Sequence, residues 1–217
     1  MAVKGTEKRK VNARRKKKGQ AKIPSLKSIG NYMNFIIGGV VVILIILLIS
    51  IIVKSCGGVK NNSPQKVVES LVKYSVEGKE KAVKKCYGAD KDISADLQAE
   101  ITASIKYYKA HNPKKVAITG CDVLAEYDKY TYVYIIYNLV LENDQSYPCI
   151  GTYMVGKKEK DYYVMSSSEI TAEMNQQAAD DYAKFMTTDA YKNYAKDYDT
   201  FIKKNPGYEE KIAGKIG

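Results

Sequence analysis

The sequence predicts an α+β fold in which helices precede and follow a curved antiparallel sheet, behind an N-terminal transmembrane helix. Three observations support this prediction. An unbroken apolar run extends from Phe35 to Val53. Apolar residues recur at helical spacing in 63–111 and again after 168, whereas 115–165 shows strand-like alternation between short turns. Helices, then strands, then helices indicate a sheet wrapped on helices in a cone-like arrangement.

The apolar run is long enough to cross a bilayer. It holds no charged residue, and its only polar side chain is Ser50. A helix of this length rises about 28 Å, close to the thickness of the hydrocarbon layer. A helix packed in a soluble core would keep one polar face, and this run has none. We therefore expect residues 34–54 to form a single retained transmembrane helix.

A cleaved signal peptide and a lipoprotein are the alternatives to a retained anchor. The run is longer than the usual apolar region of a signal peptide, which has about 7–15 residues, and no Ala-x-Ala site follows it. Ser55-Cys56-Gly57 resembles the end of a lipobox, although Lys54 stands where a small or apolar residue is expected. We expect Cys56 to carry no lipid.

The charge distribution sets the expected orientation. Residues 1–56 contain twelve Lys/Arg and one acidic residue, whereas 57–217 contain 23 Lys and 23 Asp/Glu. The positive-inside rule places the tail, residues 1–33, in the cytoplasm and the C-terminal part outside the cell membrane. The tail is polar enough to be disordered. Its densest basic run should contact anionic lipid, through Arg14, Arg15, Lys16, Lys17 and Lys18.

Three helices should follow a linker at 55–62. Ser63-Pro64 is typical of a helix start, because serine caps and proline fits the first turn. This helix should end at Gly78, a second should span 79–87, and a third should span 94–111 before Asn112-Pro113. Inward-facing residues should include Val68, Leu71 and Ile101.

Four strands should follow, at 115–127, 130–142, 147–155 and 162–165. Short turns between them predict an antiparallel meander. The strand at 130–142 is apolar on both faces, so it should be central, with Ile135 and Leu139 buried. Pro148 should lie where the missing donor does least harm.

The C-terminal residues 168–217 should form a helical extension. Ala172, Ala179, Tyr182 and Phe185 should face inward, and 187–189 should start a second helix that ends at 205–207. A tyrosine stripe on this second helix is more often packed on its own domain than on a partner. Its members are nevertheless interface candidates: Tyr191, Tyr194 and Tyr198.

Ser63 to Leu71, with its Pro-x-x-Val-Val core, and the step from Gly78-Lys79 to Tyr87 resemble extracytoplasmic domains of the nuclear-transport-factor-2-like (cystatin-like) superfamily. Lys79 departs from the acidic or amide residue of that pattern. The resemblance covers residues 63–167 and implies a cone with a pocket. Because the superfamily hosts isomerases, dehydratases, carriers and scaffolds, it implies no particular activity.

Few residues suggest chemistry. The only histidine, His111, is expected on the surface at a helix end, and one histidine cannot supply a multi-histidine metal site. An isomerase-like pocket would need a buried carboxylate and a tyrosine hydroxyl. Asp122, the acid within an otherwise apolar strand, and Asn138 on the next strand are weak ligand-pocket candidates, although Asp122 also fits a bulge or edge acid. No phosphate loop or Gly-x-Ser-x-Gly motif is present. We expect no cofactor, metal or catalytic residue.

Three cysteines follow the linker, at 86, 121 and 149. Cys121 and Cys149 are most simply apolar strand residues, and bridges from Cys121 to Cys149 or to Cys86 remain open. No Cys-x-x-Cys pair indicates a zinc or thioredoxin-like site.

The expected function is that of a single-pass, membrane-anchored extracytoplasmic module that binds a protein or envelope component without catalysis. Self-association is a further expectation, whereas the charge-neutral outer domain gives no reason to expect nucleic acid. The alternatives are a small-ligand carrier, an isomerase-like enzyme that uses the cone pocket, and a subunit of a secretion or conjugation complex.

Overall fold

The computed structural model describes residues 58–89 and 92–217. The expected membrane span at 34–54, the basic run at 14–18 and Cys56 lie outside these residues. No helix within the described ranges combines the length and the apolar character needed to cross a membrane.

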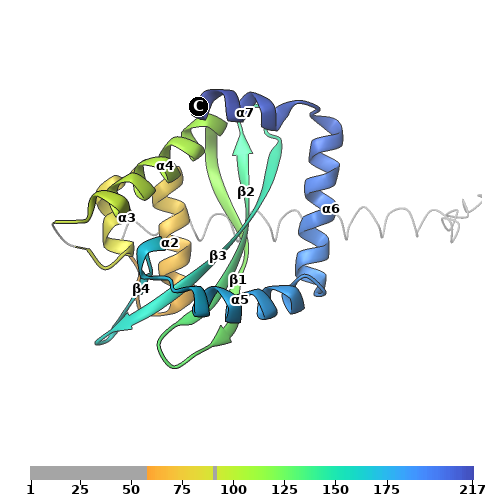
Figure 1. The fold of residues 1–217 in the computed structure, drawn as a ribbon. Coiled ribbons are helices and arrows are strands. Elements are labelled where there is room, and N and C mark those ends of the chain that lie inside the picture. The colour runs from red at the N-terminus through yellow and green to blue at the C-terminus, as the bar shows by residue number, and fades with distance from the viewer. Residues whose placement is uncertain (1–57, 90–91) are drawn as a thin grey trace, which may run out of the picture. The chain divides into compact units, whose positions relative to one another are not determined.

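The described chain has an α+β architecture (Figure 1). Three helices come first: α2 (Pro64–Val76), α3 (Glu80–Cys86) and α4 (Ala95–His111). Four strands follow: β1 (Pro113–Glu126), β2 (Thr131–Leu141), β3 (Ser146–Lys158) and β4 (Asp161–Val164). The chain ends with a 3₁₀ turn and three helices: η1 (Ser167–Glu169), α5 (Ala172–Phe185), α6 (Asp189–Lys204) and α7 (Tyr208–Ile216).

Capping residues fix the ends of the N-terminal helices where the sequence predicts them. The Ser63 hydroxyl accepts a hydrogen bond from the Lys66 amide, and the Ser94 hydroxyl accepts one from the Leu97 amide, both at 3.2 Å. Each bond satisfies an amide that has no partner within its helix. Asn112 ends α4 in the left-handed region, with φ of 50°.

The four strands form the predicted antiparallel meander, in the order β1-β2-β3-β4. β2 lies between two partners, which confirms its predicted central place. The pairing of β1 with β2 shifts register at three points, so β1 is irregular. The sheet is not strongly curled, which departs from the cone-like curvature expected from the sequence. Helices rather than sheet closure enclose the core.

The main core lies between the sheet and the N-terminal helices. The residues predicted to be buried there are between 0% and 3% exposed: Val68, Leu71, Ile101, Ile135 and Leu139. Phe201 of α6 belongs to the same cluster, so the C-terminal helices share this core. Burial of these aliphatic side chains is the main stabilising contribution of the fold.

A smaller cluster joins α5 to the sheet. It is formed by Tyr130, Tyr132, Met154 and Ala178. Two predictions for α5 are wrong, because Ala172 and Ala179 are exposed. The inward stripe runs instead through Met174, Ala178, Tyr182 and Phe185. At helical spacing these four residues share one face of α5, and Ala172 and Ala179 lie off that face.

Helix α7 has no counterpart among the expected elements. Residues 205–207 do end α6, as predicted, but Gly207 adopts φ of 76° and lets the chain turn into a new helix. Ile212 is buried on this helix. The C-terminal helix therefore adds a cover to the core that local sequence signals did not indicate.

Candidate functional site

One edge of β3 is only partly covered by another strand. β3 pairs with β2 from Ser146 to Val155, but β4 pairs only with Val155 to Lys158. Near this junction, the Met165 amide donates to the Met154 carbonyl at 2.9 Å. Backbone groups of alternate residues point to opposite edges of a strand, so Thr152 shares the free side with Met154. Among the described residues, the preceding half of β3 therefore has no strand partner on this side.

Pro148 lies on the same unpaired half of β3. By the same alternation, its nitrogen points toward the free edge. A proline there removes a donor that no neighbouring strand requires. This agrees with the expectation that Pro148 occupies a position where its missing donor does least harm.

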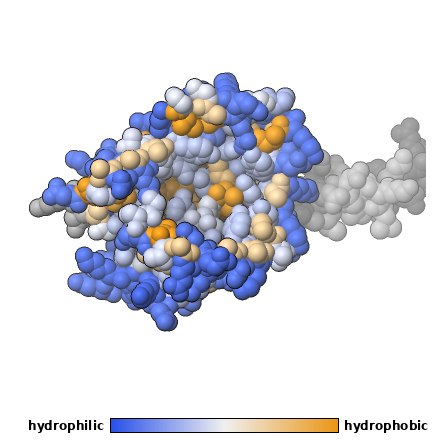
Figure 2. Space-filling view, viewed as in Figure 1, coloured by the Kyte–Doolittle hydropathy of each residue, from blue (hydrophilic) through white to orange (hydrophobic). Residues whose placement is uncertain are grey.

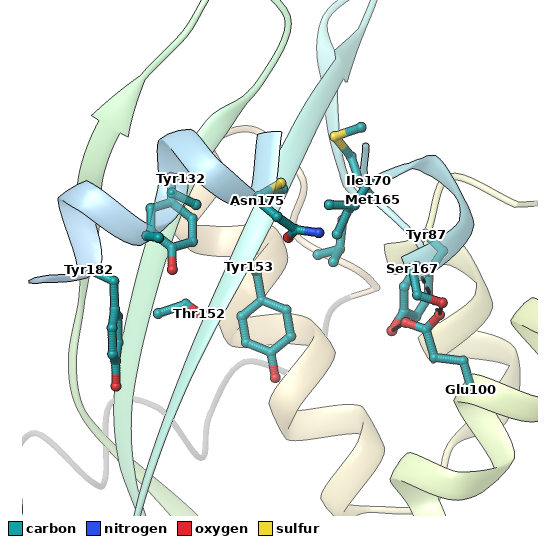
Figure 3. Close-up of a pocket in the computed structure, with 14 residues that line it drawn as sticks. Tyr87, Glu100, Tyr132, Thr152, Tyr153, Met165, Ser167, Ile170, Asn175 and Tyr182 are labelled. Carbon is teal, nitrogen blue, oxygen red and sulfur yellow. Dashed lines mark hydrogen bonds between the residues drawn. The ribbon is translucent and has the colours of Figure 1, made fainter. Parts of the chain in front are cut away.

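A hollow opens beside the free edge. In Figure 1, α4, α7, α6 and α5 frame β3, and Figure 2 shows the surface hollowed between these elements. A cavity of about 440 Å³ lies there, with walls from α4, β3, η1 and α5 (Figure 3). Its labelled polar lining residues are Tyr87, Glu100, Tyr132, Thr152, Tyr153, Ser167, Asn175 and Tyr182.

The one carboxylate of this lining is already bonded. The Tyr87 hydroxyl donates to Glu100 Oε1 at 3.0 Å, while the Ser167 amide and hydroxyl donate to Oε2 at 3.1 and 2.8 Å. These bonds tie α4 to η1. Glu100 thus positions the cavity wall, and it is not a free group available for proton transfer to a bound molecule.

Tyr153 and Tyr182 in the cavity wall remain neutral hydroxyls at physiological pH. Burial raises the pKa of Tyr153 to about 12 and also raises that of Tyr182. Neutral tyrosines offer hydrogen bonds and aromatic contact area, but they are poor nucleophiles and poor bases. The cavity is therefore suited to binding.

The two pocket candidates from the sequence do not meet. Asp122 lies on β1 opposite Tyr134, whereas Asn138 lies on β2 opposite Ala117. Asp122 is exposed, and its Oδ1 accepts hydrogen bonds from the Val123 amide at 2.8 Å and from Gln65 Nε2 at 3.5 Å. Neither candidate is among the residues that line the cavity.

His111 is buried, so its predicted surface position is wrong. It is 6% exposed, and its Nδ1 lies 2.9 Å from the Tyr208 hydroxyl. The ring packs on Tyr107, Tyr147 and Tyr208, with centroid distances of 4.7, 4.7 and 5.6 Å. Helix α7 supplies Tyr208, which explains why the end of α4 is covered. Burial lowers the pKa of His111 to about 4.

The tyrosine stripe of α6 packs on its own domain. Tyr191, Tyr194 and Tyr198 form a chain of ring contacts with centroid distances of 6.0 Å, and Tyr198 also contacts Tyr147 at 6.1 Å. The Tyr198 hydroxyl donates to Glu209. All three side chains are half-buried.

The three cysteines of the described chain are free thiols, and neither of the bridges left open by the sequence is formed. Cys121 lies on β1 and Cys149 on β3, as predicted. Burial raises the pKa of Cys86, Cys121 and Cys149 to about 12. Since the thiolate is the reactive form, these residues are not activated nucleophiles.

Thr152, Tyr153 and Asn175 line the cavity but were not identified from the sequence; Tyr182 was predicted only to face inward. They come from β3 and α5, which are separated along the chain by β4 and η1. Pro148 was the one local signal, because a proline inside a strand indicates an edge without a partner.

Comparisons with protein-family models, with curated proteins and with solved structures give no match. The fold and the site therefore define only a class of protein. It is an α+β domain with a four-stranded antiparallel sheet, helices before and after that sheet, and a tyrosine-rich cavity beside a free strand edge.

Proposed function

We propose that the protein is a single-pass, membrane-anchored module whose extracytoplasmic domain binds a protein or envelope component as a scaffold or accessory subunit. The observation that carries this proposal is the cavity beside the free edge of β3. Its tyrosines supply amphipathic contact area of the kind that interfaces use, and the strand edge supplies backbone hydrogen-bonding groups.

Under this proposal, the side chains with potential for catalysis take no part in a reaction. His111 is enclosed by tyrosines, the cysteine thiols have raised pKa values, and Glu100 accepts three hydrogen bonds from Tyr87 and Ser167. Asp122 is exposed on another strand. Activated nucleophiles and general bases depend on paired groups within hydrogen-bond reach, and in the cavity wall Glu100 forms such pairs with the Tyr87 and Ser167 hydroxyls. We assign these pairs a structural role, because they join α4 to the end of α3 and to η1.

A small-ligand carrier is the second candidate. The cavity volume of about 440 Å³ favours it, because ligand pockets commonly measure about 300–1,000 Å³. The likeness to the nuclear-transport-factor-2-like superfamily also belongs to this proposal. This likeness is supported by the three helices that precede an antiparallel meander and by the packing of α2 against that sheet.

The orientation can be tested in intact cells. Protease added from outside should remove the domain that follows residue 54 and leave the basic tail protected. The reason is that the basic residues preceding the apolar run favour the cytoplasmic side. Antibodies against tags at the two ends would report each fragment. Protection of the C-terminal tag in intact cells, together with its loss after lysis, would contradict the proposed topology.

The binding surface can be tested by site-specific photo-crosslinking in the full chain. A photoreactive amino acid at Tyr182 in the cavity wall should form an adduct, whereas the same group at Asp122 on β1 should not. Mass spectrometry separates the two candidates, because a protein or envelope polymer adds a large mass and a carrier ligand adds a small one. Equal labelling at both positions, or labelling at Asp122 alone, would contradict the cavity as the binding surface.

A further inference from the structure

We propose that the β3–β4 hairpin and the lysines beside it form a membrane-contact surface that rests on anionic lipid headgroups next to the anchor. This inference rests on the proposed membrane span at residues 34–54. It adds a second membrane contact, made by the outer domain itself.

The chain enters the outer domain beside β4, close to the turn of this hairpin. The Tyr162 amide donates to the Asn61 carbonyl at 2.9 Å, which joins the entering chain to β4. The Lys60 amide donates to Ser70 Oγ at 3.2 Å, and Val59 packs against the core. From Val59 onward the entering segment is thus part of the folded domain.

The short connection keeps this part of the domain near the bilayer. Gly58 follows Lys54 by four residues, which span at most about 14 Å when fully extended. The headgroup region accounts for roughly 5–7 Å of that distance on each side of the bilayer. At most about 9 Å then separates Gly58 from the headgroups, comparable with the Debye length of about 8 Å at physiological ionic strength.

The surface at this point carries exposed lysines that lie outside ion pairs among the described residues. Gly58, Val59 and Asn61 line a recess together with Lys85, Lys157 and Lys158. The basic side chains in and beside it are all exposed, and within residues 58–89 and 92–217 none of them forms an ion pair: Lys60, Lys85, Lys157, Lys158 and Lys160.

Three carboxylates line the recess and balance its three lysines: Glu159, Asp161 and Glu169. Lys60 and Lys160 beside the recess bring the net charge of this set of residues to two positive. Lys157 Nζ also lies 5.2 Å from the centre of the Tyr162 ring, so an aromatic side chain accompanies the basic group. Because the anchor tethers this positive surface close to the bilayer, the surface meets lipid headgroups at a high effective concentration, as in an intramolecular binding event. The lipid bilayer is therefore the occupant that the chain length selects.

Hydrogen exchange of the full chain in nanodiscs tests this inference. One set of nanodiscs contains phosphatidylcholine alone, and the other contains phosphatidylcholine mixed with phosphatidylglycerol. Amides of residues 157–161 should exchange roughly fivefold or more slowly in the anionic nanodiscs. The difference should disappear in high salt, because an electrostatic contact is screened.

Charge variants provide the matched comparison. The triple variant K157E/K158E/K160E should lose the slower exchange, whereas K192E/K196E/K211E should retain it. The second set changes three exposed lysines of α6 and α7 by the same charge. Unchanged exchange of β2 amides in both variants would show that each variant is folded. If the hairpin variant does not fold, the salt dependence of exchange in the wild-type chain provides the test.

The outcomes separate this inference from the proposed function. Equal exchange of the hairpin in the two lipid compositions would overturn the membrane-contact surface and leave the anchor standing. Slower exchange produced by soluble polyphosphate in phosphatidylcholine nanodiscs, to the same extent as by anionic lipid, would assign the surface to free anionic polymers and overturn it too. Failure of the chain to insert into either nanodisc would instead overturn the proposed anchor.

Discussion

Replacement of Leu139 by alanine should lower the free energy of unfolding by about 2–5 kcal/mol. Leu139 is 0% exposed near the C-terminal end of β2, where Val116 on β1 and Tyr147 on β3 are its neighbours across the sheet. Strands on both sides hold the backbone in place, so the space left by the missing methyl groups cannot collapse easily. Urea unfolding of the detergent-solubilised chain, followed by circular dichroism, would measure the loss.

Val140→Ala is the matched control for this substitution. Val140 is the next residue of the same strand, faces the other side of the sheet and is half-buried. Its truncation should cost less than half of the Leu139 value. Equal losses would contradict the assignment of strand faces. A loss below about 0.5 kcal/mol for Leu139→Ala, the range of ordinary surface substitutions, would contradict its burial.

Features encoded within a few neighbouring residues were predicted well. Ser63-Pro64 and Ser94 mark helix starts because their hydroxyls satisfy nearby amides, and Asn112-Pro113 ends α4 through its own backbone preference. The alternation in residues 130–142 identified the central strand, since it is apolar on both faces. These signals depend on local geometry alone, so one sequence is sufficient to read them.

Features that depend on distant parts of the chain were not predictable in the same way. The burial of His111 requires Tyr208, 97 residues later, and nothing near His111 indicates that α7 will cover it. The free edge of β3 exists because β4 pairs with only its last four residues. The cavity beside that edge combines residues of α4, β2, β3, β4, η1 and α5, and their spacing in the sequence carries no information about their proximity.

The structure also predicts acid sensitivity centred on His111. Nδ1 is within hydrogen-bond distance of the Tyr208 hydroxyl, and Nε2 is buried without a partner among the described residues. Burial and, to a smaller extent, the nearby Lys215 ammonium lower the pKa of His111 to about 4 against the opposing effect of Glu209. Protonation would therefore place a positive charge in an aromatic enclosure, which is unfavourable.

The direction of the pH effect follows from the two pKa values. The pKa of His111 is about 4 in the folded protein and 6.5 as the unperturbed value. Between these values the unfolded chain binds more protons, so acid favours unfolding. The stabilisation from neutral His111 is complete above pH 6.5 and is lost as the pH falls through 4. At about 1.4 kcal/mol for each pKa unit, the total loss is about 3 kcal/mol.

His111→Gln should remove most of this pH dependence, because glutamine fills part of the same space and cannot become protonated. Unfolding free energies of the wild type and the variant, measured at a series of pH values from 7 to 4, should converge as the pH falls. The variant is expected to be less stable at neutral pH, since it loses the ring contacts with Tyr147 and Tyr208. Parallel pH profiles for the two proteins would show that other groups cause the acid sensitivity and that His111 remains accessible to protons in the folded state.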